Sequence, residues 1–319
     1  MLMYIITFVL LLVLAKLGLK LNRKWNGSYV CLLGKTVIVT GANTGIGFVT
    51  AQDFAKRGAK VILACRSKDK AEEAKQKMVS VTGNPNIIVE IVDFASFESV
   101  KTFAQEIIAK EDRLDILVNN AGAIFFENIT TIDGLSATMQ VNYFAHFLLT
   151  SLLLDLLKKS APSRIVNVAS VTAHWANPNL NDINYFSASF LANTFYVNYG
   201  NAKLCLILWT NELARRLKNS GVTVNSLHPG IIYTDLQRGT NTLIKFLYQV
   251  ATLLIFKNVE EGAQTTIYVS LSRDIENVTG EYFVNCAIGN MPRLARDENL
   301  ATKVWNLSEQ LVKKLKNDT

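Results

Sequence analysis

The stretch Lys35-Thr-Val-Ile-Val-Thr40-Gly41-Ala-Asn-Thr-Gly45-Ile-Gly47 decides the fold. Its first part, 35–40, is short, largely apolar and rich in β-branched residues, which predicts a buried strand. A glycine-rich turn follows at once, and a helical pattern then runs to Arg57. Strand, glycine turn and helix together form a phosphate-binding unit of dinucleotide folds. Glycines let the backbone approach a pyrophosphate, and the helix N-terminus offers free amides.

The same alternation continues along the chain. We expect strands at 59–65, 86–92, 114–120, 164–169 and 222–228, and helices at 67–80, 96–111, about 134–159 and 199–218. Strands that alternate with helices, without hairpin signals, predict a doubly wound parallel sheet of the Rossmann α/β type. No linker or repeat divides residues 34–319, which we therefore interpret as a single domain. Ligands in such sheets bind beyond the carboxyl ends of the strands.

Composition narrows the class of protein. The chain has 319 residues, is 50% hydrophobic and carries a net charge of +7. The positive charge is scattered and forms no basic block with interleaved aromatic residues, so we expect no nucleic-acid partner. The cysteines stand far apart and the three histidines do not cluster. These patterns indicate free thiols in a reducing compartment, and we expect no metal site.

The N-terminus carries a membrane signal. Residues 1–19 are nearly all apolar, interrupted only by Lys16, and Lys20, Arg23 and Lys24 follow. A membrane span needs about 20 such residues. We therefore interpret residues 1–24 as a hydrophobic membrane anchor with a basic flank, which by the positive-inside rule places the following domain in the cytosol. A segment that dips into the membrane, or one that is cleaved, stays open.

Tyr199 and Lys203 lie four residues apart in an expected helix and so share one face. A phenol ordinarily loses its proton at about pH 10. We expect the nearby ammonium of Lys203 to lower the pKa of Tyr199, so that Tyr199 acts as a general acid or base near neutrality. Alone, the pair is more typical of a surface lysine over a half-buried tyrosine, and the rest of the chain decides between the two interpretations.

Other polar residues follow strands or interrupt an apolar helix. Arg66 follows the second strand, where NAD-binding folds usually place an acidic residue, and its guanidinium suits a 2′-phosphate; we therefore expect NADP(H). Asp93 is predicted either to cap the next helix or to receive the adenine amino group. Asn142 lies within an apolar helix and needs hydrogen-bond partners there.

Taken together, these motifs resemble the short-chain dehydrogenase/reductase family over about residues 34–290. The ordered motifs are the glycine turn, Asn119-Asn120-Ala121-Gly122, Asn142, Ser170, Tyr199-x-x-x-Lys203 and Pro229-Gly230 with Thr234. Within the family the chain is most similar to the membrane-associated retinol dehydrogenase-like branch. It departs from that branch at Ala145 and Ala169 and in the long segment 171–198, which bears on the substrate.

The resemblance implies roles for residues of this sequence. Tyr199 would be the acid/base, Lys203 would lower its pKa and bind the nicotinamide ribose, Ser170 would polarise the substrate oxygen, and Asn142 would position Lys203, through a water. The implied cofactor-binding residues are Gly41, Asn43, Thr44, Gly45, Ile46, Gly47, Arg66, Asp93, Phe94, Asn120, Ala121, Gly122, Tyr199, Lys203, Pro229, Gly230, Ile232 and Thr234.

The expected function is NADP(H)-dependent interconversion of a lipophilic alcohol, such as a retinoid or steroid, and its carbonyl. Residues 236–257 are strongly apolar and are expected to cover the substrate, or else to pack in the core or in a homodimer surface. The resemblance favours carbonyl reduction at the endoplasmic reticulum or a lipid droplet. Two alternatives stay open: a catalytically silent membrane scaffold or nucleotide sensor, and a reductase of small polar carbonyls. A serine hydrolase is disfavoured, because Ser170 lacks the Gly-x-Ser-x-Gly elbow.

Overall fold

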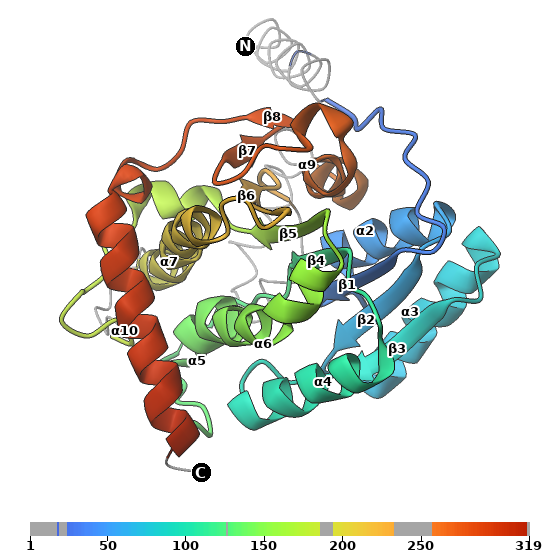
Figure 1. Cartoon of the computed structure of the whole chain (residues 1–319). Helices are drawn as coiled ribbons and strands as arrows, with labels where there is room; N and C mark the ends of the chain where they lie inside the picture. The colour runs from blue at the N-terminus through green and yellow to red at the C-terminus, as the bar shows by residue number, and fades with distance from the viewer. Residues whose placement is uncertain (1–17, 19–23, 126, 186–193, 233–256, 318–319) are drawn as a thin grey trace, which may run out of the picture.

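The computed structural model describes residues 18, 24–125, 127–185, 194–232 and 257–317. Its centre is an eight-stranded sheet in the order β3-β2-β1-β4-β5-β6-β7-β8 (Figure 1). The first seven strands in this order are parallel, and β8 pairs antiparallel with β7. The strands are β1 (Thr36–Thr40), β2 (Lys60–Cys65), β3 (Ile87–Ile91), β4 (Ile116–Asn119), β5 (Ser163–Val168), β6 (Val222–His228), β7 (Tyr282–Val284) and β8 (Ala287–Ile288).

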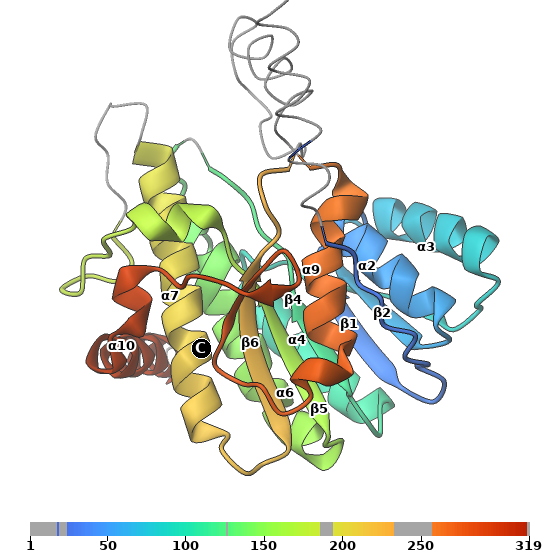
Figure 2. The same ribbon diagram turned by 90° about the horizontal axis from the view of Figure 1, so that it is seen from above.

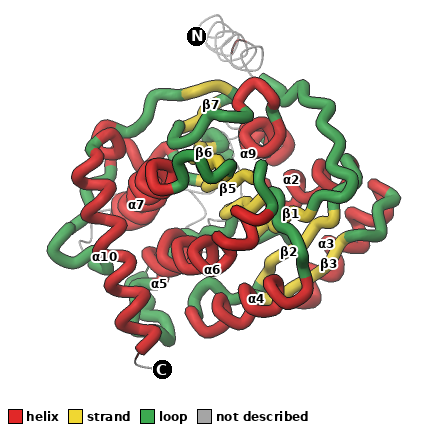
Figure 3. The backbone as a smooth tube through the Cα atoms, viewed as in Figure 1, coloured by secondary structure: helices red, strands yellow, loops and turns green. Residues whose placement is uncertain are grey.

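Helices cover both faces of this sheet (Figures 1 and 3). One face is covered by α4 (Phe97–Lys110), α6 (Ala145–Lys159) and α7 (Thr194–Arg216), with α10 (Glu298–Asn317) packed on α7. The other is covered by α2 (Gly45–Lys56), α3 (Lys68–Thr82) and α9 (Val259–Leu271). The short helices η4 (Arg273–Ile275) and η5 (Arg293–Arg296) connect these elements.

The strands build two cores because successive side chains point to opposite faces. In β1, Val37 and Val39 pack with Phe54 of α2, whereas Ile38 packs in the core beneath α4 and α6. All three are fully buried. This burial on both faces explains why the strands are continuous apolar runs, and it confirms the predicted Rossmann-type fold.

The prediction of one continuous α-helix over 134–159 was wrong in one respect, because a π turn interrupts it. The structure has α5 (Ala137–Met139), a π-helical turn η1 (Gln140–Phe144) and then α6. The N–H of Ala145 donates to the carbonyl of Gln140, five residues earlier, which is the mark of a π turn. Apolar periodicity does not reveal such a bulge. The run 137–159 is long and apolar enough to cross a membrane, but 72% of that apolar window is buried inside the protein, as in a core helix.

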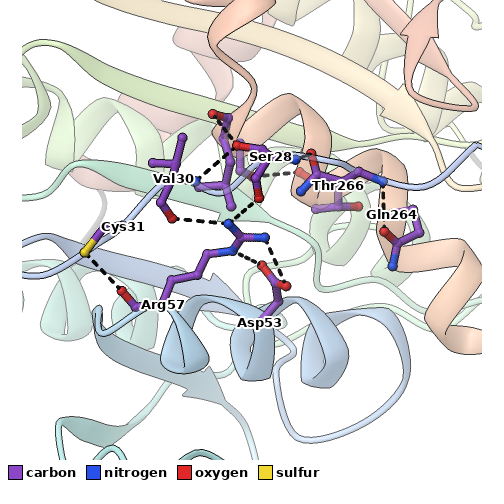
Figure 4. Close-up of polar contacts among 10 residues, drawn as sticks. Ser28, Val30, Cys31, Asp53, Arg57, Gln264 and Thr266 are labelled. Atoms are coloured by element: carbon purple, nitrogen blue, oxygen red, sulfur yellow. Dashed lines mark hydrogen bonds and ion pairs between the residues drawn. The ribbon is translucent and has the colours of Figure 1, made fainter.

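The carboxyl ends of the parallel strands form one edge of the sheet, here called the carboxyl edge (Figure 2). An extended strap, residues 24–33, runs from this edge across α9 and α2. Arg57 fastens it by donating to the carbonyls of Ser28 (2.6 Å) and Val30 (3.2 Å) while pairing with Asp53 (2.6 Å) (Figure 4). A groove of about 670 Å³ lies between the strap and the C-terminal part of α2.

Some predicted features lie outside the described residues. They are residues 1–17 and 19–23 of the anchor segment, Thr234, and residues 236–256 of the segment expected to cover the substrate.

Candidate active site

Three of the four predicted catalytic residues, Tyr199, Asn142 and Lys203 itself, come together at the carboxyl edge around the amine of Lys203. Lys203 Nζ donates to the carbonyl of Val168, the last residue of β5, at 2.9 Å, and lies 5.6 Å from the centre of the Tyr199 ring. A methyl group placed on Gly122 would stand 3.4 Å from Lys203 Nζ and 2.8 Å from Asn142 Oδ1. Lysine, tyrosine, asparagine and the loop after β4 thus share one small volume.

Ser170, the fourth, lies two residues after the end of β5, where the chain turns into a short helix. Its Oγ accepts hydrogen bonds from the amide (3.2 Å) and hydroxyl (3.0 Å) of Thr172, which start the helix η2 (Val171–Trp175). Gly200, next to Tyr199, packs so closely on Thr172 that an added Cβ would lie 2.8 Å from the Thr172 carbonyl oxygen. This approach holds α7 against the Ser170 turn.

The electrostatic prediction for Tyr199 was wrong in direction. Burial raises the pKa of the Tyr199 phenol above its ordinary value, and burial lowers the pKa of Lys203 from 10.5 to about 7. Lys203 is 2% exposed, so desolvation disfavours its ammonium and weakens its pull on the phenol. Tyr199 therefore holds its proton at neutral pH.

Asn142 satisfies its buried amide through the loop after β4. Its Nδ2 donates to the carbonyls of Ala123 (2.7 Å) and Thr138 (2.9 Å), and its Oδ1 accepts from the Ala123 amide (3.0 Å). These hydrogen bonds join Asn142 to the loop and to α5 rather than to Lys203. Its side chain therefore positions the backbone beside the lysine.

The turn 41–47 has the shape that a pyrophosphate needs. Gly41 has φ +65°, and a Cβ on Gly47 would lie 2.4 Å from the Gly41 carbonyl oxygen and 2.5 Å from Asn120 Nδ2. The Thr44 side chain makes no capping hydrogen bond at the start of α2, and the first turn of α2 carries no acidic residue. This leaves the N-terminal amides of α2 and its positive dipole end to an anion, so the residues fit a dinucleotide.

The loops after β3 and β4, beside this turn, hold further predicted cofactor residues. Thr40 Oγ1 accepts from the amides of Asn120 (2.9 Å) and Ala121 (2.8 Å), a role that the sequence did not reveal. Asp93 Oδ1 accepts from the Ala95 amide at 2.9 Å, while Ser96 caps α4. Of the two alternatives for Asp93, capping of α4 is therefore wrong, and contact with the adenine stays a prediction.

Arg66 follows β2 and is exposed, with no hydrogen bond or ion pair to another described residue. A free guanidinium at this point fits the 2′-phosphate of NADP(H).

The loop after β6 meets the glycine turn at α9. Gly230 has φ +94°, and its amide donates to His228 Nδ1 at 3.0 Å. Ile232 packs on Gly262 of α9, where an added Cβ would lie 2.2 Å from Ile232 Cδ1 and 3.6 Å from Ile46 Cγ1. Gly262 thus brings the two predicted isoleucines together. Sequence reasoning missed it, although the Asn258-x-x-Glu261 capping box marks the helix start.

Comparison with known proteins agrees with this geometry. The sequence model of the family described as "short chain dehydrogenase" matches residues 35–190 and 183–244 of this chain. The chain belongs to the short-chain dehydrogenase family. As a short-chain dehydrogenase it is an oxidoreductase, and the expected resemblance to the retinol dehydrogenase-like branch is confirmed by the relatives that follow.

Retinol dehydrogenase 11 from Mus musculus is 41% identical over 308 residues, which cover 96% of this chain and 95% of that protein. Retinol dehydrogenase 14 from Homo sapiens is 42% identical over 301 residues, with coverage of 89% and 88%. A short chain dehydrogenase from Burkholderia cenocepacia, solved in complex with NADP, has a TM-score of 0.63 at 25% identity and covers 80% of this chain and 97% of that one. This NADP complex agrees with the expected cofactor.

Lys203→Met should remove a pH-dependent contribution to stability. Since the folded pKa of Lys203 is depressed, the unfolded chain binds more protons between about pH 7 and 10.5, and the wild-type free energy of unfolding rises with pH for this group. Relative to Lys203→Met it should rise by up to about 1.4 kcal/mol per pH unit between pH 7 and 9. Urea unfolding at pH 7, 8 and 9 measures the difference; parallel curves would contradict a depressed pKa.

Gly122→Ala should reduce kcat about tenfold or more, because its methyl group displaces Asn142 or Lys203. Gly27→Ala is the matched control, since nothing lies within 4 Å of an added Cβ there and no positive φ is involved. Steady-state kinetics of both variants test this. Equal kcat in the two variants would show that the close approach is irrelevant to turnover.

Arg66→Ala should raise the KM for NADPH about tenfold or more and leave the KM for NADH nearly unchanged, because a charged hydrogen bond to phosphate is lost. The thermal midpoint should not change, since Arg66 is exposed and unpartnered among the described residues. Lys77→Ala, an exposed charge further along α3, is the control. A similar loss with both cofactors would argue against a 2′-phosphate contact.

Proposed function

We propose that this protein is an NADP(H)-dependent, membrane-attached oxidoreductase that interconverts a lipophilic alcohol, in the first place a retinoid, and its aldehyde. The observation that carries the proposal is the convergence of Tyr199, Asn142 and Gly122 on the Lys203 amine, next to a glycine turn shaped for a pyrophosphate. The relatives named retinol dehydrogenase support an alcohol group as the reacting group.

The chain's own residues perform the proton chemistry. Ser170 holds the substrate oxygen, and Tyr199 donates a proton to that oxygen during reduction or removes it during oxidation. Lys203, tied to the Val168 carbonyl, supports the developing negative charge on Tyr199 and the substrate oxygen. When bound along the glycine turn, the nicotinamide cofactor supplies or accepts the hydride.

Carbonyl reduction is the proposed direction. A general acid must carry its proton at working pH, and burial raises the pKa of Tyr199, which keeps it protonated at neutrality. A 2′-phosphate contact through Arg66 would select NADP(H), the cofactor pool that cells use for reductions.

Membrane attachment and a lipophilic substrate belong together in this proposal. The strap begins at Lys24, whose carbonyl accepts a weak hydrogen bond from Cys286 Sγ at 3.7 Å. Cys286 follows β7, so Lys24 lies at the carboxyl edge, the edge that also carries Ser170. Trp25 is 58% exposed there, as suits a residue at the membrane–water interface. We propose the cytosolic face of the endoplasmic reticulum or a lipid droplet as the location.

The deciding experiment uses membranes that carry the full chain, with all-trans-retinal and either NADPH or NADH. We expect reduction with NADPH, a much lower rate with NADH, and a loss of at least about a hundredfold in Tyr199→Phe, which keeps the ring but lacks the acid.

Two results would count against the proposal. NADPH binding without turnover of any carbonyl would favour a scaffold or nucleotide sensor. Faster reduction of small polar ketones than of retinal, in a chain whose residues 1–23 are replaced by a soluble tag, would favour a polar substrate.

A further inference from the structure

The loop Ala121–Ala123, which follows β4, is held by two side chains from one helical run. Asn142 of η1 bonds both the amide and the carbonyl of Ala123. One turn later, His146 Nε2 lies 2.8 Å from the carbonyl oxygen of Ala121. Gly122 lies between these two attachments and directly faces Lys203 Nζ. The position of the loop beside the lysine therefore depends on both side chains.

The two side chains share a face because they are four residues apart. The π turn at Gln140–Phe144 widens the helix at this point, and π turns are frequent at functional sites. Two side chains of one helical run, Asn142 and His146, thus bond to the two ends of the loop Ala121–Ala123.

His146 is fully buried, and its ring packs on Phe94 with the ring centres 4.6 Å apart. Phe94 follows Asp93, the residue expected at the adenine. Burial, assisted by the charge of Lys203, lowers the pKa of His146 to about 3, so the imidazole is neutral at physiological pH. A neutral ring that bonds a carbonyl through Nε2 carries its proton there, and Nε2–H is the donor.

This tautomer leaves Nδ1 as a buried acceptor without a partner among the described residues. Such an atom costs stability. If His146 only filled space beside Phe94, an apolar ring of similar size would serve at least as well. A role for the Nε2–H donor is what distinguishes histidine from phenylalanine at this position.

We propose that His146 is a positioning residue: its Nε2–H fixes the Ala121 carbonyl and, with Asn142, holds the Ala121–Ala123 loop in place for the cofactor and against Lys203. The inference rests on the proposed function in so far as this loop contacts the cofactor. It assigns to His146 an effect on cofactor affinity and on kcat, and none on the affinity for the carbonyl substrate.

The test compares three substitutions. His146→Phe keeps the packing on Phe94 and removes the donor. His146→Gln and His146→Met have similar lengths, and only Gln offers an N–H at the position of Nε2. Phe147→Leu is the control: it is the neighbouring buried residue, and it packs on Tyr143, Trp209 and Trp305 instead of the loop.

We expect His146→Phe and His146→Met to raise the Kd for NADPH and lower kcat, each about tenfold, with the KM for retinal unchanged, because a misplaced loop disturbs the geometry that the cofactor and lysine require. His146→Gln should recover both quantities to within about threefold. Phe147→Leu should lower the thermal midpoint and leave the Kd for NADPH unchanged.

Wild-type Kd and kcat in His146→Met, or equal losses in the Gln and Met variants, would overturn the proposal. The Kd for NADPH is read from cofactor fluorescence, without turnover. If the wild-type protein binds NADPH and reduces no retinal, the proposed substrate fails, while the Gln and Met variants still decide the role of His146.

Discussion

The candidate site depends on one buried amine, that of Lys203, at the carboxyl edge of the sheet. Lys203 is 2% exposed, yet its Nζ is bonded to the carbonyl that ends β5. Burial of this kind is unfavourable for an ammonium and lowers its pKa to about 7. The surrounding elements hold this buried amine in place. Helix α7 carries the lysine, η1 and α6 hold the loop beside it, and β5 supplies its hydrogen-bond acceptor.

Close approaches of backbone make that arrangement possible, and glycine allows each of them. Gly47 lies against the Gly41 carbonyl, Gly122 faces Lys203 and Asn142, and Gly262 receives Ile232. An added carbon on Gly122 or Gly262 would push apart segments that are distant in the sequence, and one on Gly47 would meet both the Gly41 carbonyl oxygen and Asn120 Nδ2. The candidate site is therefore a set of contacts between elements, held by the two cores on either side of the sheet.

The sheet and its helices could be predicted from periodicity because burial on both faces leaves a clear sequence pattern. Every predicted strand was found with ends within two residues, as at β6 (Val222–His228). The short antiparallel hairpin of β7 and β8 was missed. Its turn uses positive φ at Asn285 and Cys286, and cysteine there is not a turn signal. The π turn was missed because one extra residue in a helical run barely changes apolar periodicity.

The candidate catalytic residues could be named from the sequence, but their electrostatics could not. Spacing placed Tyr199 and Lys203 on one helix face. Motif order placed Ser170 and the glycine turn at strand ends and Asn142 inside a helix. The depth of burial around Lys203 depends on α6, β5 and η2 together, and it reversed the expected shift of the Tyr199 pKa. His146 and Gly262 had no local signal, since each matters only through a contact with a distant segment. The sequence by itself determined the fold class, the family and the candidate pair Tyr199 and Lys203. Tertiary structure decided how deeply Lys203 is buried and which segments hold it, because desolvation and close approach arise only when distant segments pack together.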